Sequence, residues 1–364
     1  MSLYLLVFAV TLLTAIVLVF TQHWHGRFSH DNSFGVQNHH TEPTPRIGGV
    51  AIVLGLAAAW GLAGQDQRAL LQPMLIAGLP AFTFGLLEDV TKKISIRSRL
   101  LATMASGVLA WYLTGTAMQH TGINAFDWAL GYLPLAVLFT AFAVGGLANA
   151  INIIDGFNGL AAGSVAVMLG AIGLIALGLG DHTLVVVCLL VACCALGFAA
   201  VNWPFGYIFL GDGGAYLLGF LLAWLAVLLP MRHLEVNAFA TLLVCAYPVL
   251  EVMFSVRRRR KRQGHHPGQA DKAHLHHFIH RRIICPLFPN MSNRFKNGLT
   301  SPICWFLTAL PCAWAVAFAQ NTAMLAVGFI LATVTYAAVY ARLTQFRWCF
   351  SPLTLRASPE VSSI

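Results

Sequence analysis

The sequence predicts an all-α fold, a polytopic bundle of about eleven transmembrane helices, and three observations support this prediction. Of the 364 residues, 58% are hydrophobic and only 10% are charged, and the mean hydropathy is +0.73. A soluble chain of this length needs far more polar surface. The apolar residues fall into runs of about 20 residues, the length that a helix needs to cross a bilayer. We see no low-complexity segment or short-period repeat, and we expect one membrane-embedded domain over residues 1–364.

Eleven apolar stretches are the candidate helices. They are residues 2–20, 47–64, 70–87, 99–116, 132–150, 158–179, 183–201, 213–230, 237–256, 301–318 and 322–341. We expect the first stretch to be retained as a helix rather than removed as a signal peptide, because it lacks a basic leader and a small-residue cleavage site. Most of the eight cysteines lie inside apolar stretches without metal-ligand spacing, so we interpret them as small hydrophobic residues.

The Lys and Arg residues predict the orientation through the positive-inside rule. Eleven crossings place six segments on one side of the membrane: 21–46, 88–98, 151–157, 202–212, 257–300 and 342–364. Every Lys and Arg except Arg68 and Arg232 lies in these segments or at their boundary. This side is predicted to be cytoplasmic, with the N-terminus outside and the C-terminus in the cytoplasm. The basic run at 257–262 suits an anchor to anionic lipids or attraction of an anionic substrate. No nucleic-acid partner is expected, because no soluble domain accompanies it.

Four short polar clusters interrupt the apolar chain on the predicted cytoplasmic side. Carboxylates at a membrane edge are costly and are therefore candidates for function. Together the clusters supply acids, amides, histidines and arginines, which suit a metal-assisted reaction on a phosphorylated substrate. The clusters are residues 43–49 (PTPRIGG), 85–99 (GLLEDVTKKISIRSR), 152–161 (NIIDGFNGLA) with 209–214 (FLGDGG), and 271–282 (DKAHLHHFIHRR).

Glu88 and Asp89 end the third apolar stretch and precede a basic loop that contains Lys93. Acids at the C-terminus of a helix are unfavourable for the helix dipole, which favours a functional role over a structural one. Asp89 is predicted to act as a base or to help hold a divalent cation. Glu88 and Asp155 are the further candidate catalytic acids, and Lys93 is predicted to contact the substrate. The alternative is that the two acids pair with the basic residues that follow.

Asn149, Asn152, Asp155 and Asn158 recur at every third position, so successive members are neighbours on a continuing helix. The glycines that follow Asp155 and Asn158 indicate a break that exposes backbone to a ligand. We expect Asn152 and Asn158 to bind a uridine, sugar or phosphate group. Hydrogen bonding between helices is the alternative.

Asp212 lies in a Gly-Asp-Gly-Gly sequence directly before an apolar stretch. Glycines permit close backbone approach, and a helix N-terminus attracts phosphate. The alternative is a plain N-cap. Combined with the other acids, Asp212 and Asp155 are predicted to hold Mg²⁺ together with substrate phosphate oxygens. The oxygen donors favour Mg²⁺, or Mn²⁺, over zinc.

His274, His276 and His277 lie with a fourth histidine in the longest loop, 257–300, which we predict to be a cytoplasmic substrate-binding loop. Imidazoles beside arginines suit phosphate recognition. Zinc binding and a solvated basic face are the alternatives, and the absence of a Cys or HExxH pattern disfavours zinc.

Thr44 and Arg46 precede a Gly-Gly pair at the start of the second stretch. Arg46 is predicted either to bind substrate or to pair with a lipid phosphate at the membrane boundary. Glu251, near the cytoplasmic end of the ninth stretch, is a lesser candidate, and pairing with the arginines that follow it is the alternative.

These motifs, in this order, resemble the polyprenyl-phosphate N-acetylhexosamine-1-phosphate transferases, glycosyltransferase family 4. The family includes the bacterial enzymes that start O-antigen, enterobacterial common antigen and teichoic acid synthesis, and the peptidoglycan phospho-MurNAc-pentapeptide translocase. The resemblance spans residues 43 to about 282. PTPRIGG resembles the family's first cytoplasmic loop, NIIDGFNGLA and FLGDGG its central motifs, and HLHH its His-x-His-His motif.

The resemblance implies a helical bundle of ten or eleven spans in the bacterial inner membrane, with a cytoplasmic active site. It implies transfer of a sugar-1-phosphate from a UDP-N-acetylhexosamine to undecaprenyl phosphate with Mg²⁺, releasing UMP. The O-antigen type is the nearest in pattern, the exact sugar stays open (GlcNAc, FucNAc or QuiNAc), and a homodimer is left open. By motif, Asp89 matches the second acid of the family's Asp-Asp pair, Asp155 and Asn158 the central acid and the following polar residue, Asp212 the metal ligand, and His274, His276 and His277 the substrate-binding histidines.

One position departs from the family pattern. Residue 88, where the family has the first Asp of the pair, is Glu. The side chain of Glu is one methylene longer, and we expect a bound group to be displaced by more than ~1 Å, which matters for aligned chemistry. A catalytically silent homologue is therefore one alternative function, and a membrane transporter or lipid flippase is another. The polar residues gather at one membrane face rather than at mid-membrane, which disfavours a transporter.

Overall fold

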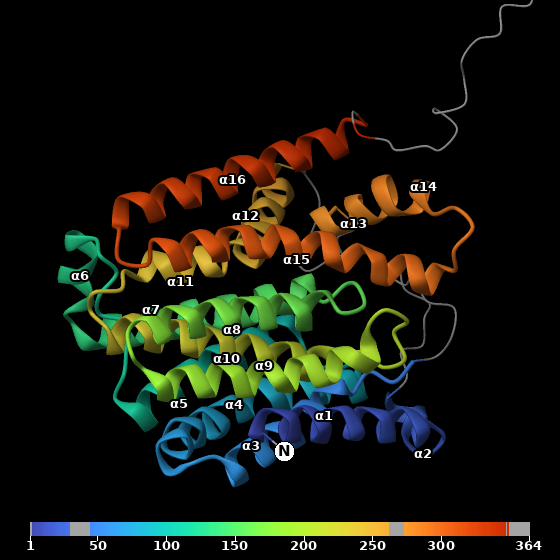
Figure 1. Ribbon diagram of the computed structural model, residues 1–364, viewed down its shortest axis with the longest axis horizontal. Helices are drawn as coiled ribbons and strands as arrows, with labels where there is room; N and C mark the ends of the chain where they lie inside the picture. Colours follow the sequence, from blue (N-terminus) through green and yellow to red (C-terminus); the bar gives the residue numbers. More distant parts are fainter. Residues whose placement is uncertain (1, 30–43, 262–272, 347, 349–364) are drawn as a thin grey trace, which may run out of the picture.

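The computed structural model describes residues 2–29, 44–261, 273–346 and 348, and its elements are helices (Figure 1). Part of the first polar cluster (Pro43) and part of the 257–300 loop (262–272) lie outside the described residues. The elements are α1 (Leu3–Phe20), α2 (Gln22–Ser29), α3 (Gly48–Leu62), α4 (Gln65–Thr91), α5 (Ile96–Thr114), α6 (Asn124–Leu130), α7 (Leu133–Ile154), α8 (Leu160–Gly178), α9 (His182–Asn202), α10 (Gly211–Arg232), α11 (Ala238–Val244), α12 (Ala246–Lys261), α13 (Leu275–Ile279), the π-helix η1 (His280–Ile284), α14 (Cys285–Leu287), α15 (Asn293–Ala317) and α16 (Thr322–Thr344).

The prediction of a polytopic helical membrane bundle is confirmed. Eight of the described helices are long and apolar enough to cross a membrane, and α11 with α12, bent by 76°, gives a ninth if the pair is one span. Each of the eleven predicted stretches contains a helix, but α3 is short, with 15 residues, and α5 is not among the described helices that are apolar enough to cross. The count of eleven spans and their orientation stay predictions.

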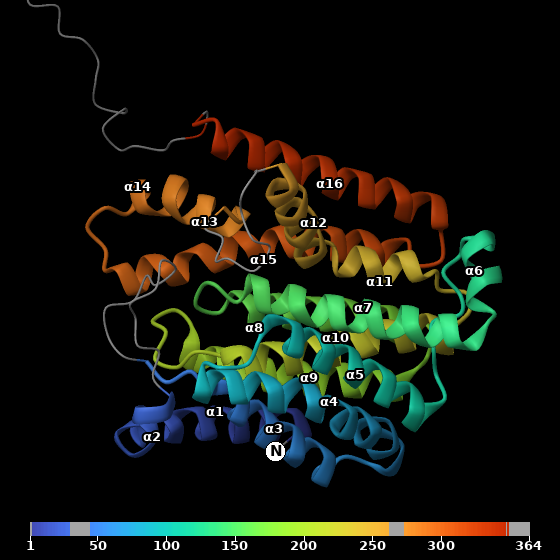
Figure 2. The ribbon, with the colours of Figure 1, turned by 180° about the vertical axis from the view of Figure 1, so that it is seen from behind.

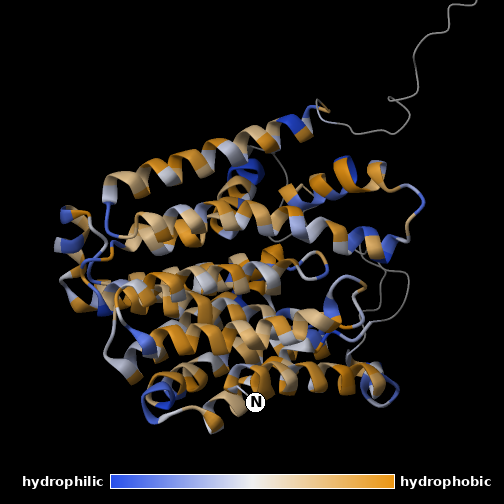
Figure 3. Ribbon diagram, in the orientation of Figure 1, coloured by the Kyte–Doolittle hydropathy of each residue, from blue (hydrophilic) through white to orange (hydrophobic). Residues whose placement is uncertain are grey.

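Hydrophilic residues gather at the two ends of the bundle, and the long helices between them are mostly apolar (Figure 3). One end carries α6 and the loops around it, and the opposite end carries α2, α13 and α14 (Figures 1 and 2). This distribution is expected for helices that run across an apolar layer with their ends in water. The described residues of the four polar clusters lie at the second end.

Helix α10 is the central element of the fold. It packs against α3, α4, α7 and α8, and its residues from Gly211 to Pro230 are all buried. A helix that is apolar all round is stable only when neighbours cover every face. The neighbours of α10 therefore determine where its first turn, with Asp212, is placed.

Glycines let two neighbouring helices approach the first turn of α10 at backbone distance. A Cβ on Gly49 of α3 would lie 2.5 Å from the backbone N of Gly214, and a Cβ on Gly85 of α4 would lie 2.5 Å from the backbone N of Gly213. Real side chains do not fit in this space, since packed interiors leave few gaps. The polar ends of α3, α4 and α10 are thus held together by glycine contacts.

We expect Gly49→Ala to destabilise the protein by about 2 kcal/mol, because the added methyl group overpacks this contact. Gly61→Ala is the matched control on the same helix, because nothing lies within 4 Å of a Cβ at Gly61. The control should be neutral or slightly stabilising. Thermal unfolding in detergent measures both, and equal midpoints for the two variants would contradict the packing described above.

At the opposite end, Asp181 joins the start of α9 to the end of α10. Its carboxylate accepts a hydrogen bond from Leu184 N (3.0 Å), which caps α9, and one from Arg232 Nε (2.7 Å), and it hydrogen-bonds His233 Nε2 (3.0 Å). Burial raises the pKa of Asp181, but these hydrogen bonds outweigh burial and lower its pKa to about 2. The sequence predicted no role for Arg232 or His233.

The lowered pKa of Asp181 predicts a pH-dependent contribution to stability. A carboxylate whose pKa is lower in the folded state stabilises the fold above its ordinary pKa of about 4, and this stabilisation is lost as the pH falls towards 2. The difference in unfolding midpoint between the wild type and Asp181→Asn should therefore be constant above pH 5 and should shrink below pH 4. A difference that does not change between pH 6 and pH 3 would show that this carboxylate does not stabilise the fold through its charge.

Candidate active site

Backbone pairing brings the first polar cluster against the Phe209–Gly214 cluster. Phe209 N–H donates to Pro45 O (2.8 Å), Gly48 N–H donates to Phe209 O (2.9 Å), and Gly49 N–H donates to Leu210 O (3.0 Å). Two sequence segments about 160 positions apart thus run side by side directly before α3 and α10. This pairing fixes Arg46 beside Asp212.

Asp89 caps the N-terminus of α10 from α4. Its Oδ1 accepts a hydrogen bond from Asp212 N–H (2.9 Å) and its Oδ2 accepts one from Gly213 N–H (2.9 Å). The side chain is only 1% exposed. The carboxylate that looked misplaced at the end of α4 therefore stabilises the positive end of a different helix. Asp212 is not an N-cap, and these two amides of α10 are occupied by Asp89 rather than open to a phosphate.

Gly211 must be glycine for this arrangement. Its φ is +73°, in the left-handed region, and a Cβ there would collide with the backbone O of Arg46 and lie 2.5 Å from Asp89 Oδ2. An L side chain rarely adopts that φ and has no room here. Gly211 thus allows the backbone of Arg46 and the carboxylate of Asp89 to lie close to the start of α10.

Two guanidinium groups and one amide surround the Asp212 carboxylate. Arg46 Nη2 donates to its Oδ1 (2.7 Å), Asn152 Nδ2 donates to the same oxygen (3.1 Å), and Arg99 Nη1 pairs with its Oδ2. Arg46 Nε also lies 3.2 Å from Asp89 Oδ1. Five residues from α4, α5, α7, α10 and the segment before α3 therefore form one charged group, which we call the α10 cluster: Arg46, Asp89, Arg99, Asn152 and Asp212.

Asp155 follows α7 and lies beside this cluster. It differs from Asp89 and Asp212, the two acids of the cluster, in its hydrogen bonding. Its half-buried carboxylate accepts no hydrogen bond from any residue that the structure describes. Burial raises the pKa of Asp155 to about 7, Arg46 opposes this rise, and the negative charges of Asp212 and Asp89 add to it. An acid without a protein partner, next to two further acids, is an arrangement that a cation would stabilise.

The donor chemistry around Asp155 fits Mg²⁺. Within the described ranges, no three His, Cys, Asp or Glu side chains are grouped to hold a metal ion. Mg²⁺ needs no such group, because it binds through one or two carboxylates and completes its octahedron with water and substrate phosphates. Asp155 is available for this role, whereas both oxygens of Asp212 are engaged by Arg46, Asn152 and Arg99. The pairing of Asp212 with Asp155 at one metal stays a prediction.

Asn158, predicted to bind substrate, contacts protein groups on all sides. Its N–H donates to Asn297 Oδ1 (2.7 Å), its Nδ2 donates to Pro204 O (2.9 Å), and its O accepts from Ser301 Oγ (2.6 Å). It is 2% exposed. In this structure, Asn158 ties the loop that carries Asp155 to α15, and its predicted contact with substrate finds no counterpart in the geometry.

The histidines are held by Glu251 of α12. Its Oε1 accepts a hydrogen bond from Leu275 N–H (2.9 Å), its Oε2 hydrogen-bonds His274 Nδ1 (3.0 Å), and His276 Nδ1 lies 3.5 Å from Oε1. Glu251 is 1% exposed. The suggested pairing of Glu251 with the following arginines is therefore wrong: its carboxylate points inward to the histidines. We call residues 273–280 the histidine segment.

The histidine segment packs directly on the loop that carries Asp155. The ring of Phe157 lies 5.6 Å from that of His276, 5.3 Å from that of His277 and 5.0 Å from that of His280. A Cβ on Gly156 would lie 3.4 Å from His276 Nε2. The fourth polar cluster is thus continuous with the α10 cluster through residues 155–157.

Three predicted site residues lie outside these contacts. Lys93 is exposed in the loop after α4. Glu88 is half-buried and accepts a hydrogen bond from Ile94 N–H (2.7 Å), so it closes that loop. Thr44 is 2% exposed, directly before the segment that pairs with Phe209. Their predicted roles toward substrate stay predictions.

Arg99 is the functional candidate that sequence reasoning missed. It was counted only among the basic residues of the loop, yet it is 15% exposed by side chain and pairs with Asp212. Its Nε is buried and has no hydrogen-bond partner among the described residues. The available signal was its position: an arginine in the first turn of an apolar helix is costly at a membrane edge unless it is paired.

Comparison with known proteins agrees with this geometry. The family model described as glycosyl transferase family 4 matches residues 71–230, which include Asp89, Asn152, Asp155 and Asp212. An undecaprenyl-phosphate alpha-N-acetylglucosaminyl 1-phosphate transferase of Yersinia pestis is 27% identical over 242 residues, 65% of this chain and 66% of that protein. Its counterpart in Escherichia coli strain K12 is 26% identical over 242 residues, 65% of each.

A protein of Bacillus subtilis strain 168, described as a probable undecaprenyl-phosphate N-acetylglucosaminyl 1-phosphate transferase, is 28% identical over 244 residues, 65% of this chain and 66% of that protein. The chain thus matches just under two thirds of the length of these relatives. The family match and the relatives confirm the resemblance drawn from the motifs. Residues 71–230 match the model of glycosyl transferase family 4, and these relatives are described as undecaprenyl-phosphate N-acetylglucosaminyl 1-phosphate transferases.

Proposed function

We propose that the protein transfers N-acetylhexosamine-1-phosphate from a UDP-sugar to undecaprenyl phosphate, giving undecaprenyl-diphosphate-sugar and UMP. A phosphate oxygen of the lipid attacks the β-phosphorus of the donor, and the bond from that phosphorus to the oxygen bridging to the α-phosphate breaks, so that UMP leaves. The relatives named above are described as transferases of this type. The observation that carries the proposal is the α10 cluster with the carboxylate of Asp155 next to it, which accepts no hydrogen bond from the residues that the structure describes.

The charges of the cluster suit the charge that this reaction develops. The donor diphosphate and the lipid phosphate are both anionic, so the reaction needs cationic groups that are already oriented. Arg46 and Arg99 are held on Asp212 (Arg46 Nη2, 2.7 Å), and the buried Nε of Arg99 is a donor without a partner in the described part of the chain. We propose that these guanidinium groups bind phosphate oxygens, as their fork geometry allows.

We assign separate roles to the acids. Asp89 positions the cluster through α10 and Arg46, rather than acting directly as the base. Asp155, with its free carboxylate, contacts the reacting groups. Asp155 would hold Mg²⁺, which would neutralise charge on the diphosphate and the leaving UMP. Mn²⁺ is the alternative metal.

The histidine segment and the loop after α7 supply the remaining contacts. His277 and His276 lie against Phe157, directly beside Asp155, so we propose that they bind the donor. The apolar helices suit an acceptor that stays in the bilayer. We further propose a bacterial inner-membrane location with this end of the bundle in the cytoplasm, where UDP-sugars are available, and a role in starting a cell-surface polysaccharide.

A donor labelled with ³²P in its β-phosphate tests this reaction. With purified protein, undecaprenyl phosphate and Mg²⁺, we expect the label in the lipid product and unlabelled UMP as the nucleotide product. EDTA should abolish the transfer. A panel of UDP-N-acetylhexosamines, with UDP-GlcNAc first and 6-deoxy amino sugars next, identifies the sugar. Release of labelled UDP instead would mean that the glycosidic bond breaks, which contradicts the proposal.

A further inference from the structure

Helix α16, the last of the described helices, contacts the first residue of the histidine segment. Tyr340 of α16 donates a hydrogen bond from its Oη to Ala273 O (3.1 Å) and accepts one from Arg258 Nη1 of α12 (3.0 Å). The phenol therefore bridges α12 and the backbone of the segment. Helix α16 lies outside residues 71–230, the part that matches the family model.

A second restraint acts on the next two residues. Glu251 of α12 accepts from Leu275 N–H and hydrogen-bonds the ring of His274. Ala273, His274 and Leu275 are thus each tied to a helix, and one of the three ties comes from α16. Losing the Tyr340 hydroxyl group would remove the hydrogen bond that α16 supplies to the backbone of the segment.

Aromatic contacts orient the Tyr340 ring. Phe278 of the histidine segment meets it edge-on at 5.4 Å, and Tyr336, one turn earlier on α16, stacks on it at 6.2 Å. Phe254 of α12 lies 4.6 Å from Tyr336 and 6.0 Å from Tyr340. These rings keep the hydroxyl group in place with little freedom to rotate.

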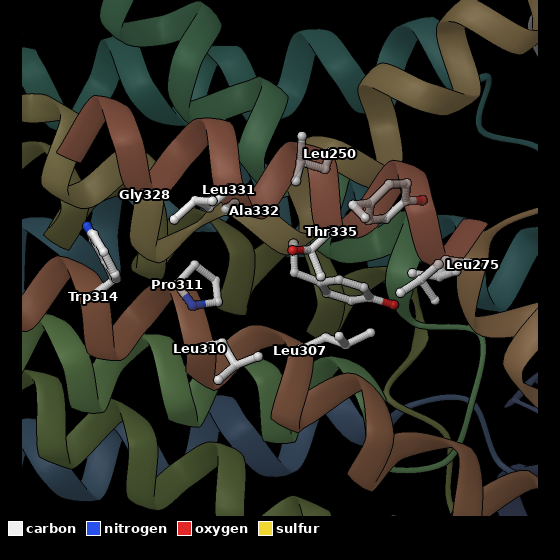
Figure 4. Close-up of a pocket in the computed structure, with 14 residues that line it drawn as sticks. Leu250, Leu275, Leu307, Leu310, Pro311, Trp314, Gly328, Leu331, Ala332 and Thr335 are labelled. Atoms are coloured by element: carbon white, nitrogen blue, oxygen red, sulfur yellow. The ribbon is translucent and has the colours of Figure 1, made fainter. Parts of the chain in front are cut away.

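The packing beneath the segment is incomplete. A cavity of about 190 Å³ lies between α12, α15 and α16, and Leu275 of the histidine segment lines it together with Leu250, Leu307 and Ala332 (Figure 4). A void supplies no contacts to the side chains that line it. Leu275 is nevertheless fully buried, so packing and the polar ties together hold the segment, and the cavity leaves the packing on this side incomplete.

We propose that Tyr340 is a positioning residue. It holds the histidine segment in the position in which His276 and His277 face Asp155 and a UDP-sugar donor. The inference rests on the proposed function for its substrate. Few contacts separate Tyr340 from the site. Tyr340 holds Ala273 by a hydrogen bond. The same segment carries His276 and His277, whose rings pack on Phe157 beside Asp155.

Tyr340→Phe tests this role, because it keeps the ring and removes only the bridging hydroxyl group. Thr333→Val is the matched control: it removes a hydroxyl group of α16 that bonds only within the helix, to Phe329 O (2.8 Å). We expect Tyr340→Phe to raise KM for the UDP-sugar about five- to tenfold, the effect of one lost hydrogen bond. The kcat and the KM for undecaprenyl phosphate should stay within twofold, and the control should match the wild type.

Hydrogen exchange gives a second readout that needs no turnover. Amides of residues 273–280 should exchange about tenfold faster in Tyr340→Phe than in the wild type or Thr333→Val, while α10 amides stay unchanged. Unchanged exchange and an unchanged donor KM would overturn the inference. An equal loss of kcat/KM for both substrates together with a lowered unfolding midpoint would also overturn it. Wild-type protein that is folded but inactive with every donor contradicts the proposed function instead, and the exchange result still decides whether Tyr340 holds the segment.

Discussion

Asp155→Asn should lower kcat for UMP formation by about 10³-fold and leave the fold intact. The activity falls because the substitution removes the one carboxylate of the site that no described residue engages, and charge stabilisation or proton transfer by such a group contributes about 10²–10⁴-fold. The fold persists because the side chain accepts no hydrogen bond from the described residues. Steady-state UMP release and thermal unfolding in the same detergent measure the two effects.

Asp181→Asn is the control for this prediction, because it removes a carboxylate at the opposite end of the bundle. Asp181 holds α9 and α10 together (Arg232 Nε, 2.7 Å) and lies far from the α10 cluster along the full length of α10. We expect this variant to lose stability and to keep kcat, the reverse of Asp155→Asn. Turnover of Asp155→Asn within tenfold of the wild type would rule out its assignment to the chemistry.

Asp89→Asn should destabilise the protein by about 3 kcal/mol and lower activity together with stability. The carboxylate is 1% exposed, accepts two backbone hydrogen bonds at the start of α10, and lies 3.2 Å from Arg46 Nε. Removing one partner of a buried ion pair costs about 3–5 kcal/mol, because the remaining charge stays desolvated. Arg46 keeps Asp212 as a partner, which places the expected cost at the lower end.

Glu88→Gln is the neighbouring control for Asp89→Asn. Glu88 is half-buried and engages Ile94 N–H in its own loop, so we expect a loss of less than about 1 kcal/mol. A comparison of unfolding midpoints separates the two acids. If Glu88→Gln were the more destabilising change, the assignment of Asp89 as the cap of α10 would be wrong.

The sequence predicted the helical fold and the gathering of polar clusters because both depend on patterns along the chain. Apolar runs determine where helices form in a membrane protein, and each of the eleven stretches holds a helix. The acids and amides of short motifs, such as Asn152 and Asp212, were found because polar groups at membrane edges need a reason to be there. In the structure, Asn152 Nδ2 donates a hydrogen bond to Asp212 Oδ1 (3.1 Å).

The partners of those groups could not be predicted from the sequence. Asp89 caps a helix that begins more than 120 positions later, and nothing local to Asp89 indicates this contact. The same holds for Arg99, whose partner is Asp212, and for Tyr340, whose partner is Ala273. These contacts depend on which helices are neighbours. Gly49 and Gly85 allow α3 and α4 to approach α10 closely, but in the sequence they indicate only helix packing in general.

Local geometry also separated residues that the motifs treat alike. Asn152 and Asn158 share one spacing, but the helix ends at Ile154, so Asn152 faces Asp212 whereas Asn158 turns towards α15. Asn149, from the same spacing, donates to Thr103 Oγ1 of α5 (2.9 Å) and so fulfils the alternative of a bond between helices. The point at which a helix ends thus decides which of its polar residues reach the site.

Formation of UMP from UDP-GlcNAc by the purified, folded protein, with and without undecaprenyl phosphate, tests the proposed transfer most directly. We predict that UMP forms with Mg²⁺ only when the lipid is present, in equal amounts with the lipid-linked product. UMP formation at the same rate without the lipid would indicate a hydrolase. A complete absence of UMP with this donor and with every other UDP-N-acetylhexosamine of the panel would contradict the proposed transfer.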